Sequence, residues 1–123
     1  MGRNHPGGAV AAADVAVAGQ VAGIMRALGT RSRVQILGRL AAGSCTVGEL
    51  VSALGMEQSA VSHQLALLRH LGLVVGERRG RQVVYALHDP HIADLLREAV
   101  SHADHRRRGL REEAAQAMPE AAA

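Results

Sequence analysis

Residues 46–71 read TVGELVSALGMEQSAVSHQLALLRHL, and this stretch decides the fold. It opens with Thr46-Val47-Gly48-Glu49, a capping-box pattern in which Thr and Glu, three residues apart, satisfy each other's backbone donors. The pattern predicts a short helix that ends at Gly55, where the chain turns. A second helix is predicted over 57–71, because its apolar residues recur at helical spacing. They are Val61, Leu65, Leu68 and Leu71. A short helix, a tight glycine-containing turn and a longer helix indicate a helix-turn-helix.

The flanking segments predict a mainly α-helical chain with one β-hairpin. Upstream, helices are predicted over 14–28 and 31–42, since each follows a capping side chain and each is followed by a glycine. Downstream, the apolar period shortens and predicts two strands, 73–79 and 82–87, around a Gly-Arg turn. Asp89-Pro90 then predicts the start of a last helix. A hairpin directly after a helix-turn-helix is the wing of a winged helix, so the predicted fold is a winged helix-turn-helix.

Glycine, proline and charge patterns predict the domain limits. A flexible N-terminal arm is expected over 1–13, which contain Pro6-Gly7-Gly8. The winged helix-turn-helix domain is expected over 14–107. A disordered tail is expected over 108–123, because the chain there combines Gly109, an Ala/Glu-rich run and Pro119.

Composition limits the class of protein. The 123 residues form one small domain, 48% hydrophobic but only 1% aromatic, so Leu, Val, Ile and Ala must build the core. No apolar stretch approaches the ~20 residues of a membrane span, and no secretory signal is recognisable, so a cytoplasmic protein without membrane partners is predicted. The single cysteine, Cys45, excludes an intrachain disulfide. A net charge of +3, with all its basic charge from Arg, favours an anionic partner.

Polar side chains gather where a winged helix would contact double-stranded operator DNA. The first two turns of the 57–71 helix, the part that reaches base edges in helix-turn-helix proteins, carry Gln58, Ser59, Ser62 and His63. Gln pairs with adenine through two hydrogen bonds, and Ser serves several bases. The hairpin tip carries Arg78, Arg79 and Arg81, which suit phosphates or the minor groove. The alternative for each group is a solvated polar surface.

The last helix carries a histidine pattern: Asp89, His91, His102 and His105. Eleven residues rotate a helix by a net ~20°, and His105 lies ~60° to the other side of His102, so the three histidines share one face. The same eleven residues separate His91 from His102 by ~16 Å, too far for one ion. Two helices crossing antiparallel about a two-fold axis would join Asp89 and His91 of one subunit to the other two ligands of its partner, giving two sites per homodimer. The alternative is a set of solvated histidines. His70 and His88 are interpreted as surface or supporting groups.

The donor set limits the metal. Three imidazoles and a carboxylate suit Zn(II), Co(II) or Ni(II). Four protein ligands in a tetrahedron would favour zinc, and expansion to six would favour nickel. His5 and the amino group of Gly2, exposed if Met1 is removed, are candidate additional ligands, and the alternative for His5 is a residue with no site.

These segments resemble the ArsR/SmtB family of metal-sensing winged-helix repressors. The resemblance covers about 15–107 and is carried by 31–37, 47–50, 58–65 and the histidine pattern. The family's arsenic and cadmium sensors place cysteines where this chain has Thr46 and Gly48, so that site is absent, and Cys45 receives no metal role. The arm and the sequence around 56–75 are most similar to nickel/cobalt sensors of actinobacteria. The resemblance implies Ni(II) first, or Zn(II) or Co(II), as effector.

The resemblance further implies a homodimeric repressor that binds its operator when metal-free and leaves it when metal binds. Two alternatives stay open: metal strengthens DNA binding, as in a co-repressor or activator, or the protein senses another signal through a partner protein. An enzyme is disfavoured and no catalytic residue is predicted, because ligands on a dimer seam of so short a chain leave little room for a substrate cavity.

Overall fold

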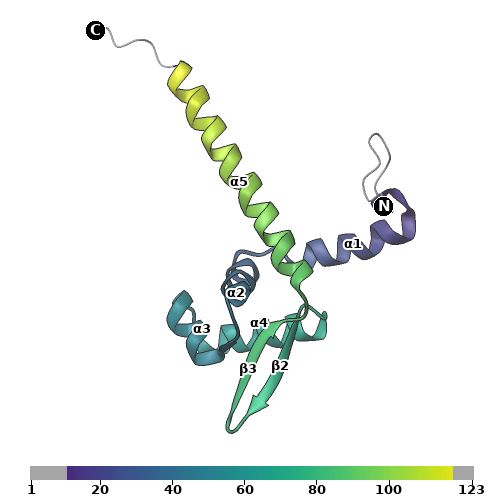
Figure 1. Ribbon diagram of the computed structural model, residues 1–123, viewed down its shortest axis with the longest axis vertical. Helices are drawn as coiled ribbons and strands as arrows, with labels where there is room; N and C mark the ends of the chain where they lie inside the picture. Colours follow the sequence, from purple (N-terminus) through teal and green to yellow (C-terminus); the bar gives the residue numbers. More distant parts are fainter. Residues whose placement is uncertain (1–10, 118–123) are drawn as a thin grey trace.

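The computed structural model describes residues 11–117, and it is a mainly helical winged helix-turn-helix (Figure 1). The elements, in chain order, are a short 3-10 helix η1 (Ala11–Ala13), α1 (Val15–Ala27), α2 (Arg31–Ala41), β1 (Cys45–Thr46), α3 (Val47–Leu54), α4 (Gln58–His70), β2 (Val74–Arg79), β3 (Gln82–Leu87) and α5 (Pro90–Ala117). The predicted fold class and the predicted order of helices and hairpin are confirmed.

The helix starts follow from capping side chains. Asp14 Oδ1 accepts hydrogen bonds from the backbone N–H groups of Ala16 and Val17, and α1 begins there. The predicted capping box opens α3: Thr46 Oγ1 accepts from the Glu49 N–H at 3.2 Å, and Glu49 Oε1 accepts from the Thr46 N–H at 2.9 Å. These local bonds fix where the helix-turn-helix begins.

Gly55 and the core fix the angle of the turn. Gly55 has φ 68°, a left-handed conformation that suits glycine and lets the chain reverse between α3 and α4. Side chains from α2, α3 and α4 then meet in a core from which water is excluded. Its most deeply buried members include Ile36, Leu37, Leu50, Val61, Leu65 and Leu68. Burial of one face of α4 leaves its other face available for contacts outside the molecule.

The sheet has three antiparallel strands in the order β1-β3-β2. The hairpin pairs from Val74 opposite Leu87 to Arg79 opposite Gln82, so the two-residue turn falls where the sequence predicted it. Gly80 in this turn has φ 65°. The two-residue strand β1 was not predicted from the sequence; it pairs with the middle of β3, Cys45 opposite Tyr85, and ties the wing to the start of α3.

The last helix is longer than predicted. α5 continues to Ala117, so residues 108–117 are helical where the sequence led us to expect the start of a disordered tail. Asp104 stabilises this extension through ion pairs with Arg107 and Arg108, three and four residues further along. In Figure 1, α5 and the β2–β3 hairpin project from opposite ends of the body. Between residues 11 and 117, no helix is long and apolar enough to cross a membrane.

Candidate DNA-binding and metal-binding surfaces

The exposed face of α4 carries the four residues predicted to read bases. Gln58, Ser59, Ser62 and His63 are all exposed, whereas Val61 on the same turns is fully buried. At 100° per residue the four exposed positions span an arc of ~140°, so they form one face at the start of the helix. Glu57, the N-cap residue, makes no side-chain capping bond, which leaves backbone N–H groups of the first turn available to a phosphate.

The wing presents the predicted arginines at its tip. Arg78, Arg79 and Arg81 are exposed on the β2–β3 hairpin. Arg79 pairs with Glu77 at 2.9 Å, but both side chains are about two-thirds exposed, so this ion pair is weak and breaks at little cost. The structure therefore puts a positively charged tip on a hairpin that extends from the helical body.

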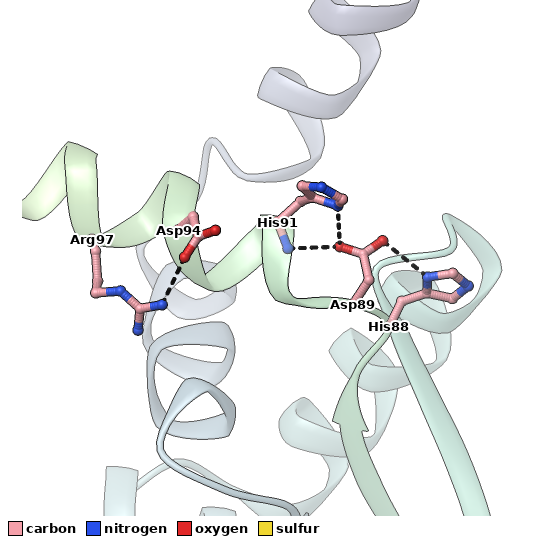
Figure 2. A network of polar contacts seen from close by, with 5 residues as sticks. All are labelled: His88, Asp89, His91, Asp94 and Arg97. Atoms are coloured by element: carbon pink, nitrogen blue, oxygen red, sulfur yellow. Dashed lines mark hydrogen bonds and ion pairs between the residues drawn. The ribbon is translucent and has the colours of Figure 1, made fainter. Parts of the chain in front are cut away.

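The start of α5 holds a carboxylate between two imidazoles (Figure 2). One oxygen of Asp89 accepts from the His91 N–H at 2.9 Å and lies 3.2 Å from the ring Nδ1 of His91. Its other oxygen lies 3.2 Å from Nδ1 of His88. The hydrogen bond from His88, followed by the contacts with His91, holds the pKa of Asp89 below its usual value. Asp89 is therefore a carboxylate at neutral pH, and His88, predicted only as a surface or supporting group, is its direct neighbour.

The other two predicted ligands lie further along the same helix. His102 and His105 are exposed, as is the side chain of His91 at 89%. Nowhere in residues 11–117 do three or more His, Cys, Asp or Glu side chains come close enough together to hold a metal ion. One chain thus carries two separate groups, Asp89 with His91 and His102 with His105, at two levels of one continuous helix.

An apolar groove runs beside the second group. It has a volume of about 650 Å³ and lies where α1, the first turn of α2 and the middle of α5 meet. Its lining includes Met25, Leu28, Val34, Leu95, Val100 and His102. Val100 and Met25 are 62% and 49% exposed, which is unusual for large apolar side chains. The groove therefore leaves apolar side chains of three helices open to contact with another molecule.

Gly2 and His5, the candidate additional ligands, lie outside the residues that the structure describes.

Cys45 is fully buried and its thiol contacts the carbonyl oxygen of Gly43. Burial raises the pKa of this thiol, so it stays protonated and is a core residue.

Comparison with known proteins agrees with this architecture. The model of the family described as "Bacterial regulatory protein, arsR family" matches residues 30–75, which run from the capping residue of α2 through the helix-turn-helix into β2. The chain is 53% identical over 109 residues to the HTH-type transcriptional regulator NmtR of Mycobacterium tuberculosis, covering 89% of this chain and 88% of NmtR. It is 42% identical over 80 residues to the HTH-type transcriptional repressor SmtB of the same species, covering 65% of this chain and 59% of SmtB.

Solved structures extend the likeness to three dimensions. The solution structure of apo-NmtR matches with a TM-score of 0.67 and 52% identity, covering 85% of this chain and 86% of that one. The homodimeric winged helix-turn-helix domain of Mb0332 from Mycobacterium bovis matches with a TM-score of 0.68 and 31% identity, covering 83% and 93%. The helix-turn-helix, its wing and the identity to NmtR along nearly the whole chain lead to one conclusion: the protein belongs to the arsR family of bacterial regulatory proteins, which are DNA-binding transcriptional regulators and not enzymes.

Proposed function

We propose that this protein is a metal-responsive transcriptional repressor of the cytoplasm. As a homodimer it binds operator DNA when metal-free and leaves the DNA when Ni(II), or alternatively Co(II) or Zn(II), binds. The observation that carries the proposal is the division of Asp89, His91, His102 and His105 into two pairs, one at the start of α5 and one further along it. Each pair alone is half a ligand set, and a second copy of α5 running antiparallel supplies the other half.

The donors fit a divalent transition metal. Three imidazole nitrogens and one carboxylate oxygen match the preferences of nickel, cobalt and zinc, and the chain offers no thiolate because Cys45 is buried. The three histidines are exposed and Asp89 is half-buried, so no rearrangement of the core is needed to reach the two pairs. Four ligands alone favour zinc. Nitrogen atoms from Gly2 and His5 would raise the coordination number and favour nickel, which is the metal we propose first.

The apolar groove supports a homodimer. The groove residues Leu95 and Ala99 lie between the two ligand pairs along α5, ~40° and ~80° around the helix from His91. In an antiparallel crossing of two α5 helices these residues meet near the two-fold axis, and each ligand pair lies opposite the other pair of the second copy. The same contact thus buries apolar surface and completes both ligand sets.

DNA binding follows from the exposed ends of the fold. The start of α4 would enter a major groove, where Gln58 and Ser62 contact base edges, while Arg78 and Arg81 on the wing contact the backbone. A dimer places two such helices at a fixed separation, so operator affinity depends on how the two subunits are oriented. The α5 helices set that orientation, and by linkage the operator and the metal must weaken each other's binding by the same factor.

A titration of operator DNA tests the proposal. We expect the wild-type dimer to retard a promoter fragment in a gel shift, and Ni(II), Co(II) or Zn(II) to release it. His102→Ala is expected to leave metal-free binding intact and to abolish the release. His70→Ala, on the last turn of α4, is the matched control and should release normally. Tighter binding with metal would contradict the repressor mechanism and favour a co-repressor or activator, whereas normal release from His102→Ala would contradict the ligand set.

A further inference from the structure

One partly buried arginine connects three helices. Arg33, in the first turn of α2, donates from Nε to the side-chain oxygen of Gln64 on α4 at 3.0 Å. It also donates from Nη1 to the backbone carbonyl of Ala27, the last residue of α1, at 3.1 Å. Within residues 11–117, every other side-chain hydrogen bond joins residues six or fewer positions apart, whereas Arg33 and Gln64 are 31 apart.

The guanidinium of Arg33 holds its two acceptors in a fixed relative position. The carbonyl of Ala27 lies in the last turn of α1, where no following N–H of the helix is available to it, so Arg33 supplies the missing donor. A guanidinium holds its donors in a rigid planar fork, so satisfying Gln64 and Ala27 together fixes their relative positions. Because both Arg33 and Gln64 are only partly exposed, water replaces these bonds less readily than on an open surface.

The residues beside this bridge line the apolar groove. Val34 follows Arg33, and Leu28 follows Ala27, and both lie in the groove that also contains His102. At the other end, Gln64 follows His63, one of the exposed residues of α4. One turn of α2 therefore separates the α1–α5 face from the DNA-reading helix, and the Arg33 bridge crosses that turn.

We propose that Arg33 is a positioning residue that holds α4 in a fixed relation to the α1–α5 face, so that a change at that face alters operator affinity through the Arg33–Gln64 bond. This inference rests on the proposed function for the identity of the signal. The structural part of the inference, that the position of α4 depends on Arg33, is measurable without metal.

A double-mutant cycle measures the coupling. Operator dissociation constants are determined by fluorescence anisotropy, with and without Ni(II), for wild type, Arg33→Met, Gln64→Leu and the double variant. We expect each single variant to reduce the ratio of the metal-loaded to the metal-free dissociation constant by about fivefold. The double variant should reduce it no further, because both substitutions break the same bond.

Two further variants separate positioning from lost charge and lost stability. Arg31→Met removes the same charge from an exposed position in the same turn and should leave the ratio at its wild-type value. Arg33→Lys keeps the charge but replaces the rigid planar fork with a single ammonium nitrogen on a flexible stem, so we expect a folded dimer with a reduced ratio. Amide NMR spectra of metal-free Arg33→Met should show shifts along α4 that Arg31→Met does not reproduce.

The outcomes are distinct. Thermal destabilisation of Arg33→Met with an unchanged ratio in Gln64→Leu and Arg33→Lys would overturn the inference and leave Arg33 a structural residue. Additive effects of Arg33→Met and Gln64→Leu would also overturn it. If wild type does not respond to Ni(II), Co(II) or Zn(II), the proposed function fails, and the NMR comparison alone then decides whether Arg33 positions α4.

Discussion

Asp89 combines a structural bond with a predicted ligand role. Its Oδ1 accepts a hydrogen bond from the His91 N–H and so caps α5, while the carboxylate faces two imidazole rings. An N-cap needs only a side-chain acceptor, which Asn supplies as well as Asp, whereas a metal site benefits from the negative charge. Two substitutions at this residue therefore separate folding from metal binding.

We predict that Asp89→Ala loses about 1 kcal/mol of stability, because the first turn of α5 loses its cap. Asp89→Asn should retain most of that stability and still bind metal more weakly. Urea unfolding of the metal-free protein measures the first effect, and a Co(II) titration followed by visible absorption measures the second. Wild-type metal affinity in Asp89→Asn would remove Asp89 from the ligand set.

Cys45 shows how burial decides the role of a reactive residue type. Its side chain is fully buried in the core beside β1, and burial raises the pKa of its thiol. Because the thiolate is the reactive form, we predict negligible reaction of the native protein with Ellman's reagent at pH 7 and full reaction in urea. Rapid, stoichiometric modification of the folded protein would show that this part of the core opens readily.

Among the elements, the β2–β3 wing carries a cluster of exposed positive charge at its tip. Arg78 and Arg81 are exposed at its tip, and Arg79 is weakly paired with Glu77. Contacts between arginine side chains and DNA phosphates add affinity without sequence preference and release counterions when they form. The wing should therefore control the salt dependence of DNA binding, while α4 controls which operator is chosen.

We predict that Arg81→Ala weakens binding to specific and unrelated DNA alike and lowers the slope of log K against log salt concentration by about 1. Arg111→Ala removes the same charge from α5, which projects from the opposite end of the body, and serves as the control. A change confined to the specific operator would mean that Arg81 reads bases. An unchanged slope would place the wing away from DNA.

Helix starts were predictable from sequence because caps are local. Asp14 and the Thr46–Glu49 box each act within three residues, so the sequence alone contains the bond. Strand β1 was missed because two residues carry no period, and its pairing depends on β3 about 40 residues later.

The extension of α5 was missed for a different reason. Gly109 disfavours a helix by only about 1 kcal/mol, and flanking Ala, Glu and Arg residues outweigh it. The Arg33–Gln64 bond was also beyond prediction, because neither residue has a local partner that would reveal it. Such contacts depend on how α2 packs against α4, which only the folded chain defines.

For the whole molecule, the two predicted functions occupy different faces of one small body. The hairpin lies at one end and α5 projects from the other (Figure 1). The apolar groove is lined by residues of α1, α2 and α5. The placement of the candidate ligands His91, His102 and His105 along α5 could be predicted from the sequence, because helical spacing fixes their face and their separation. The groove could not, because it forms where three helices meet and depends on their packing.

If each metal site takes ligands from two subunits, a mixed dimer of two complementary variants must restore a site that neither variant has alone. One subunit carries Asp89→Ala and His91→Ala, the other carries His102→Ala and His105→Ala, and different affinity tags isolate the heterodimer. Each mutant homodimer lacks half of every ligand set. We expect neither homodimer to bind Ni(II) tightly, whereas the heterodimer should recover one complete site and half the wild-type stoichiometry. A heterodimer that binds no more metal than the two homodimers would contradict the sharing of ligands between subunits.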